Sequence, residues 1–338
     1  RALFLGLGTG VTASTAALDG GLQVDAVELL PEVIEASSHF TPATPGLQVM
    51  AADARRYVRA TDRRYDVIVA DNFHPARSGS GSLYTVEHFQ AVRGRLADAG
   101  LFCQWLPLHQ LDLATLRSIV QSFVAVYPGG WAVLANNSLE TPVIGLVGTA
   151  DGHRFDTAAL RARLQRAALP PGFGIDDGFA LLGSFVAGPQ ALAAFAGDAV
   201  LNTDDHPVVA YAAPHATYAP AEAPRERLIA LLHEVSVVPA EVINPMPDDR
   251  GWPDRLAAYW AARDRFVEAG RSVRPAADVQ QMLAQVREPL LAVLRISPDF
   301  RPAAEPLARM AAALAHTDAA AAQVLLNEIA STTRKPIR

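Results

Sequence analysis

The sequence predicts an α/β fold: a doubly wound, mostly parallel sheet with an edge hairpin, followed by a C-terminal α-helical region. Over residues 1–128, short apolar runs alternate with helix-forming segments, which is typical of parallel strands joined by right-handed crossovers. The first run, Ala2–Leu5, leads directly into the glycine-rich segment Gly6–Gly10 and then into a helix-forming stretch. Beyond residue 225, apolar residues recur at helical spacing.

Composition restricts the class of protein. The 338 residues are 50% hydrophobic, enough for one large α/β domain and a smaller appendage. A net charge of −6, without basic runs interleaved with aromatics, argues against a nucleic-acid partner. The single cysteine, Cys103, excludes an intrachain disulfide and agrees with a reducing, cytoplasmic location. No apolar stretch is long enough to span a membrane. Because the chain opens on a core strand without an initiator Met, we expect a piece of a longer protein.

The opening glycines have the spacing Gly6-x-Gly8-x-Gly10. Glycines permit a sharp turn close to a ligand, and the following helix offers free N–H groups to it. A dinucleotide fingerprint needs its third glycine where this chain has Val11. The observed spacing fits the turn of S-adenosylmethionine-type enzymes, and a plain glycine-rich turn is the alternative interpretation.

Acidic residues follow three predicted strands. Glu28 ends the strand over 22–29, 18 residues beyond Gly10, where a carboxylate meets ribose hydroxyls; a solvated acid is the alternative. Asp53, before Ala54, either caps a helix through residue 58 or, with the neighbouring backbone, holds an adenine amino group; the two roles are compatible. Asp71 closes the strand over 65–70, where open parallel sheets bind ligands, unless it only forms a turn.

The remaining elements follow from periodicity and turn residues. The predicted elements are helices over 31–38, 85–96 and 113–126, strands over 47–51 and 101–106, an edge hairpin of 131–135 with 143–148, short helices within 151–200 around a Pro-Pro-Gly loop at 170–172, and a mobile loop over 72–82. Leu201–Pro207 predicts a compact polar turn; Asp204, Asp205 and His206 could suggest a metal, but contiguous side chains rarely converge on one ion.

The last third of the chain predicts a linker and a helical tail. Residues 214–224 are rich in Ala and Pro, which favours a linker between a domain over 1–213 and a tail over 225–338. The tail combines Ser297–Phe300 with an Ala-rich helical pair, which indicates a degenerate tetratricopeptide-like unit packed on the α/β domain or on a partner. Three expected core sets are Leu256, Trp260 and Val267; Leu307, Met310 and Leu314; and Val324, Leu325 and Ile329.

Taken in order, these residues resemble the spermidine synthase family over roughly residues 1–213. The motifs that carry the resemblance are Gly6-Leu-Gly-Thr-Gly10, Val27-Glu28, Ala52-Asp53, Val69-Ala-Asp71, Ser82-Leu-Tyr-Thr-Val-Glu-His-Phe89 and Phe102-Cys-Gln-Trp-Leu106. The chain looks most like bacterial spermidine synthase-like domains that follow a membrane segment and carry a stretch like 201–207. The resemblance implies a Rossmann-like, class I S-adenosylmethionine-dependent methyltransferase fold, and a location in the cytoplasm or on the cytosolic face of the inner membrane.

The resemblance also implies an activity: transfer of an aminopropyl group from decarboxylated S-adenosylmethionine to a small amine such as putrescine, with release of methylthioadenosine and without a metal. Asp71 would orient the amine and take its proton. The loop over 72–82 would be the gate, and a homodimer is compatible with the family. The nucleoside would be held by Gly6, Gly8, Thr9, Gly10, Glu28, Asp53 and Ala54, and the amine would lie near Asn72, His74, Tyr84 and Gln104.

Two positions depart from the family. Aminopropyltransferases carry an acid where this chain has Thr9, and a second acid of the Asp71 signature is replaced by His74. An imidazole anchors a cationic polyamine less well than a carboxylate does. Two alternatives therefore stay open: a methyltransferase that uses S-adenosylmethionine on the same scaffold, and an inactive nucleoside-binding or interaction module.

Overall fold

The computed structural model describes residues 1–71, 73–149, 154–166, 177–244 and 250–333. The chain forms two compact units, each built from two stretches of sequence. The first unit comprises Arg1–His153 with Ala187–Ser236, and the second comprises Arg154–Val186 with Val237–Arg338.

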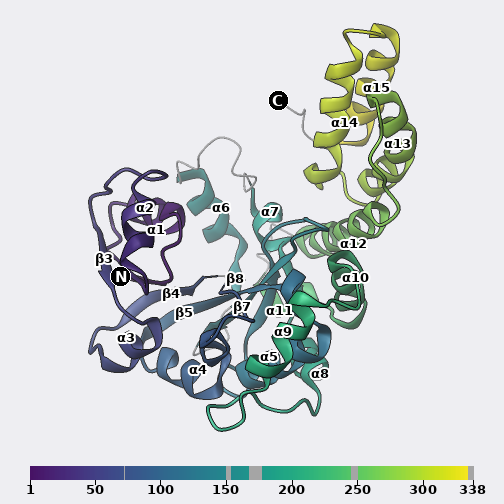
Figure 1. The fold of residues 1–338 in the computed structure, drawn as a ribbon. Coiled ribbons are helices and arrows are strands. Elements are labelled where there is room, and N and C mark those ends of the chain that lie inside the picture. The colour runs from purple at the N-terminus through teal and green to yellow at the C-terminus, as the bar shows by residue number, and fades with distance from the viewer. Residues whose placement is uncertain (72, 150–153, 167–176, 245–249, 334–338) are drawn as a thin grey trace. The chain divides into compact units, whose positions relative to one another are not determined.

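The first unit is built on a mostly parallel sheet, as predicted (Figure 1). Its strands are β1 (Ala2–Leu5), β2 (Val24–Glu28), β3 (Leu47–Ala51), β4 (Tyr65–Ala70), β5 (Leu96–Pro107), β6 (Trp131–Leu134) and β7 (Val143–Thr149), in the order β3-β2-β1-β4-β5-β7-β6. Strands β1 to β5 pair in parallel, whereas β7 is antiparallel to β5 and to β6, so the predicted hairpin is confirmed. The chain re-enters this unit at the end of β9 (Phe185–Ala187).

Helices join and flank these strands. They are α1 (Val11–Ala17), α2 (Pro31–Ser37), α3 (Ala54–Ala60), the 3-10 helix η1 (Ser80–Tyr84), α4 (Val86–Arg93), the 3-10 helix η2 (Leu108–Gln110), α5 (Leu113–Val124), α8 (Pro189–Ala196), α9 (Val208–Tyr218) and α10 (Pro224–Glu234). Side chains that accept from free backbone N–H groups begin three of them: Asp53 for α3, Thr85 for α4 and Asp112 for α5.

The second unit is largely helical (Figure 1). Its elements are β8 (Phe155–Asp156), α6 (Thr157–Arg166), α7 (Gly178–Leu182), α11 (Pro239–Val242), β10 (Ile243–Asn244), α12 (Trp252–Gly270), α13 (Val279–Ile296), α14 (Arg301–Leu314) and α15 (Ala319–Thr332). The predicted core sets are buried except Met310, which is half-buried, and Val324, which is 52% exposed. Placing Val324 in the core was wrong because its helical neighbour Leu325 takes the inward-facing position.

Residues 154–186 belong to the same compact unit as the tail, because α12 is bonded to them. Phe179 stacks on Trp252 at 4.2 Å between ring centroids. Trp260 Nε1 donates to the carbonyl of Leu182 at 3.0 Å, and the buried Arg263 donates to the carbonyl of Gly183 at 3.1 Å. These long-range contacts are not visible in local composition, so the predicted single domain over 1–213 differs from the observed division.

The predicted linker over 214–224 was wrong for its first part. Pro214 lies inside α9, whose inner face of Val209, Ala213 and Ala216 is buried. The following helix, α10, belongs to the first unit because the buried Arg227 donates to the carbonyls of Leu111 and His109. Composition predicted a linker, but burial of the apolar face stabilises a helix despite its proline.

Among the described residues, no helix is both long and apolar enough to cross a bilayer. The Pro-Pro-Gly loop at 170–172 lies outside the described residues. The tetratricopeptide-like interpretation of the tail stays a prediction.

Candidate functional site

Three parallel strands end side by side and place the glycine turn and two acids at one edge of the sheet. The register pairs Leu5 of β1 with Val27 of β2 and with Ala70 of β4. The next residues along these strands are Gly6, Glu28 and Asp71. The sequence therefore predicted this meeting point from strand ends alone.

The glycine turn has a backbone that only glycine adopts without strain. The φ angles of Gly6, Gly8 and Gly10 are 95°, 54° and 77°. The N–H of Gly6 donates to the carbonyl of Val27 at 2.8 Å, which ties the turn to β2. Thr9 is exposed at the tip, and its carbonyl accepts a 2.7 Å hydrogen bond from Thr41 Oγ1.

Glu28 holds the glycine turn with its own carboxylate. Its Oε2 accepts from the N–H groups of Leu7 at 3.1 Å and Gly8 at 3.5 Å, and its Oε1 accepts from Leu30 at 3.1 Å. A carboxylate offers about four acceptor positions. The three bonds leave one of these positions, and contact of Glu28 with a ribose diol stays a prediction.

Asp71 lies directly against the glycine turn. A Cβ atom placed on Gly6 would lie 2.9 Å from Asp71 Cβ, and one placed on Gly8 would lie 3.6 Å from Asp71 Oδ2. The N–H of Asp71 donates to the carbonyl of Leu5 at 2.9 Å, and the residue is exposed. The two glycines thus leave the space that the acid needs, and Asp71 faces solvent next to the turn.

Asp53 performs the capping role predicted for it. Its carboxylate accepts from Arg56 N–H at 2.7 Å, and Ala54 is the first residue of α3. Contact with an adenine stays a prediction.

Two of the predicted amine-binding residues are buried and hold backbone around Asp71. Tyr84 is fully buried and donates from its hydroxyl to the carbonyl of Phe73 at 2.8 Å. Burial, and then the negative charge of Asp71, raise the pKa of Tyr84 far above its usual range. Gln104 is also fully buried; its Nε2 donates to the carbonyls of Asp71 at 3.4 Å and Trp105 at 3.0 Å.

Of the two remaining predicted amine-binding residues, the structure describes His74 but not Asn72. His74 is half-buried, and its ring stacks with Tyr218 at 6.2 Å between centroids. Its buried Nδ1 has no hydrogen-bond partner within the part of the chain that the structure describes. Asn72 lies outside the described residues.

The end of the predicted mobile loop is the short helix η1, which is anchored by a residue that the sequence analysis did not single out. Asn202 is fully buried. Its Nδ2 donates to the carbonyl of Gly81 at 3.2 Å, while its Oδ1 accepts from Val209 N–H at 3.1 Å. Gly81 suits this position because a Cβ would lie only 3.0 Å from the backbone nitrogen of Ala210. The available signal was the polar run Leu201–Pro207, which predicts a turn and forms part of the family resemblance but gave no role to Asn202.

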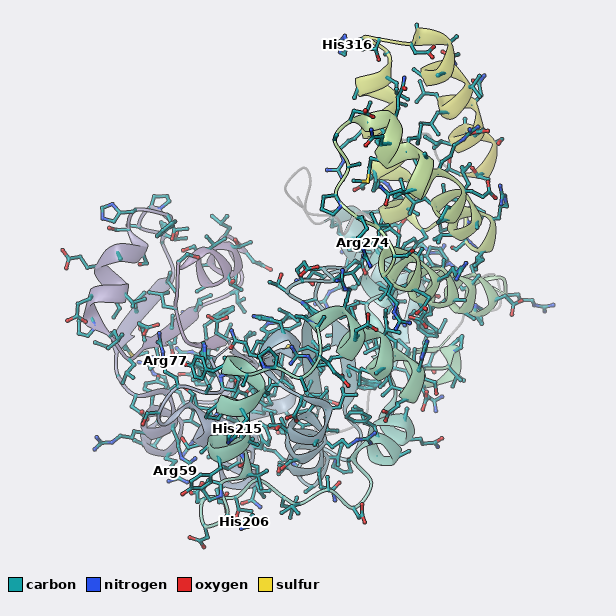
Figure 2. The ribbon with its side chains drawn as sticks, turned by 45° about the vertical axis from the view of Figure 1, so that its right-hand side comes forward. Arg59, Arg77, His206, His215, Arg274 and His316 are labelled. Carbon is teal, nitrogen blue, oxygen red and sulfur yellow. The ribbon has the colours of Figure 1, made fainter. Side chains whose placement is uncertain are left out.

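That run does form a turn, and its first aspartate is an ion-pair partner. The N–H of Thr203 donates to the carbonyl of His206 at 3.1 Å. Asp204 pairs with Arg55 and Arg59 and accepts from Thr85 Oγ1 at 3.0 Å; Figure 2 labels Arg59 and His206 in this region. Partial burial raises the pKa of Asp204, but the hydrogen bonds from Arg55 and Thr85 outweigh it and lower the pKa below its usual value. Among the described residues, no group of three or more His, Cys, Asp or Glu is arranged to hold a metal.

Comparisons with known proteins agree with the resemblance. No family model matches the chain. Polyamine aminopropyltransferase 2 of Hyperthermus butylicus is 28% identical over 164 residues, which cover 42% of this chain and 54% of that protein. The polyamine aminopropyltransferase of Methanocaldococcus jannaschii is 34% identical over 98 residues, which cover 27% of this chain and 33% of that protein. The chain therefore spans about half of the first relative's length and a third of the second's.

Solved structures resemble the chain at lower sequence identity. A probable spermidine synthase from Corynebacterium glutamicum is 23% identical with a TM-score of 0.46, covering 60% of this chain and 72% of that one. Human methyltransferase-like protein 13, in complex with SAH, is 18% identical with a TM-score of 0.41, covering 52% of this chain and 86% of that one. These overlaps do not discriminate between aminopropyl and methyl transfer. The sequence matches nevertheless relate part of this chain to the polyamine aminopropyltransferase, or spermidine synthase, family.

Proposed function

We propose that this chain transfers an aminopropyl group from decarboxylated S-adenosylmethionine to a small amine such as putrescine and releases methylthioadenosine. The observation that carries the proposal is the position of Asp71, whose carboxylate lies against the glycine turn at the ends of β1 and β4. The curated relatives named polyamine aminopropyltransferase support the same reaction class.

The chemistry needs a carboxylate at this place. A primary amine with a pKa of about 10 is mostly protonated at neutral pH and cannot attack carbon in that form. Asp71 attracts the ammonium and accepts one of its protons, which frees the nitrogen lone pair to form the new N–C bond. The donor supplies a propyl carbon activated by the sulfonium, whose C–S bond breaks with both electrons going to sulfur. No metal is needed to expel this leaving group, so the remaining requirement is alignment of amine and carbon.

Replacing Asp71 by Asn tests the proposal. Asp71→Asn removes the proton acceptor but keeps the shape, so turnover should fall by about a thousandfold or more, the upper range for loss of a general base. Donor affinity, measured by calorimetry, should stay within a few-fold of the wild type. Asp62→Asn makes the same chemical change at an exposed residue outside the site and should leave both quantities unaltered. An equal loss of affinity and rate would instead make Asp71 a donor ligand.

Thr9 favours a second candidate, methyl transfer from S-adenosylmethionine. Thr9 is exposed on the glycine turn and places a neutral side chain at the position where the family carries an acid. Calorimetry with the two donors separates the candidates. Tight binding of S-adenosylmethionine without binding of the decarboxylated form would favour methyl transfer, and binding of neither would leave an inactive or interaction module.

A further inference from the structure

Tyr84 makes one polar contact that links η1 to the segment after Asp71. Its hydroxyl donates to the carbonyl of Phe73 at 2.8 Å, across a separation of 11 residues. The Tyr84 side chain is fully buried, so an incoming amine has no access to it. Its raised pKa keeps the hydroxyl protonated, and therefore a donor, over the whole working range of pH.

Phe73 also contacts the backbone of the acid and the glycine turn. Its N–H donates to the carbonyl of Asp71 at 2.9 Å. Its ring carbon Cε1 would lie 3.3 Å from a Cβ placed on Gly6. Phe73 thus contacts both the acid's backbone and the turn, so a shift of its backbone would move Asp71 relative to Gly6.

The helix that carries Tyr84 is itself fixed from several sides. Asn202 bonds the carbonyl of Gly81, and Arg55 donates to the carbonyl of Ser82. The N–H of Val86, just after η1, donates to the carbonyl of Asn202 at 3.0 Å. Tyr84 therefore has a rigid base from which to hold Phe73.

We infer that Tyr84 is a positioning residue. Asn202 anchors η1, and the hydroxyl of Tyr84 in this helix fixes the Phe73 carbonyl. This contact thereby sets the place of Asp71 over the glycine turn. The inference deepens the proposed function and rests on it, since it assigns Tyr84 to orienting the proton acceptor rather than to binding the amine.

The test compares two variants, in each of which a buried tyrosine loses its hydroxyl. Tyr84→Phe removes only the hydroxyl that bonds the Phe73 carbonyl. Tyr127→Phe is the matched control, because Tyr127 is also buried and donates to the carbonyl of another phenylalanine, Phe89, at 3.4 Å. Thermal melting, donor affinity, kcat and KM for the amine are measured on both variants.

We expect kcat of Tyr84→Phe to fall by about tenfold to a hundredfold, because small misplacements of a catalytic group have effects of this size. Donor affinity and the KM for the amine should stay within about twofold. Tyr127→Phe should melt at a similarly lowered temperature and keep the kcat of the wild type. Equal kcat in Tyr84→Phe and wild type would overturn the inference, as would equal losses in the two variants. A raised KM with unchanged kcat would make Tyr84 an amine-binding residue.

Hydrogen exchange separates failure of this inference from failure of the proposed function. The peptide that contains Phe73 should exchange about fivefold faster in Tyr84→Phe, the effect of losing a hydrogen bond worth about 1 kcal/mol. Unaltered exchange would overturn the inference whatever the activity. A wild-type protein that binds the donor but releases no methylthioadenosine with any amine would overturn the proposed function, and the exchange result would then still decide whether Tyr84 holds Phe73.

Discussion

The two sides of the candidate site are built in different ways. The donor side, made of Gly6–Gly10 and Glu28, is held by bonds among the first 41 residues, such as those from Leu7 and Gly8 to Glu28 and from Thr41 to Thr9. The acid side, made of Asp71, Phe73, Tyr84 and Gln104, depends on residues far along the chain, above all Asn202. Local sequence is therefore enough to specify the turn that is proposed to bind the nucleoside, whereas the placement of the acid requires the completed fold.

The donor side and the acid side also differ in which polar groups form their hydrogen bonds. The donor side uses backbone N–H groups and an accessible carboxylate, which a ligand can reach. The acid side uses buried side chains that bond backbone carbonyls, including fully buried Tyr84 and Gln104. Buried hydrogen bonds of this kind hold a geometry because breaking one leaves an unpaired group in the interior.

Gly6, where the two sides meet, should give the largest effect. Gly6→Ala combines a φ of 95° with a Cβ 2.9 Å from Asp71 Cβ, so it disturbs the turn and the acid together. We expect unfolding free energy to fall by about 2–4 kcal/mol, from strain and overpacking, and donor binding to be lost. Gly20→Ala is the control, since its Cβ would meet nothing within 4 Å. Donor affinity that survives in Gly6→Ala would show that the two sides are independent.

The pH dependence of stability tests the burial of His88 in α4, the helix that follows η1. His88 is fully buried in α4, and neither ring nitrogen has a hydrogen-bond partner among the described residues; burial, followed by the charges of Arg55 and Arg59, lowers its pKa to about 3. Below a pH of about 6.5 the unfolded chain binds a proton that the folded chain does not, so stability falls as pH falls. From about pH 7.5 to 5 this loss is about 2 kcal/mol.

Urea unfolding at both pH values, on wild type and His88→Leu, measures that contribution. The pH dependence should be smaller by this amount in His88→Leu and unaltered in His39→Gln, which changes an exposed histidine. The same slope in wild type and His88→Leu would mean that His88 is protonated in the folded protein.

Glu28→Gln should give the smallest effect of these variants, and that effect should be on donor affinity rather than on kcat. The amide keeps one acceptor oxygen but loses the charge, so donor affinity should fall by about tenfold. The kcat at saturating donor should stay within about threefold, because Glu28 bonds the backbone of the glycine turn and of Leu30, whereas Tyr84 and Gln104 bond the backbone around Asp71. Glu32→Gln, at an exposed position in α2, controls for the lost charge. A kcat that falls as far as the affinity would contradict the separation of the two sides.

The sequence by itself determined the order of strands and α-helices over residues 1–149, the glycine turn, and the meeting of Glu28 and Asp71 at one sheet edge. These follow from short-range rules: apolar runs of strand length, glycines where φ is positive, and acids where parallel strands end. Even the cap formed by Asp53 is a local bond that a sequence can indicate.

Only the tertiary structure decided how the acid is held and where the units divide. Asn202 lies 121 residues from Gly81, and Trp260 lies 78 residues from Leu182, yet these pairs fix η1 and assign residues 154–186 to the helical unit. No local pattern specifies which distant carbonyl a buried side chain will meet, because that choice depends on how the whole core packs.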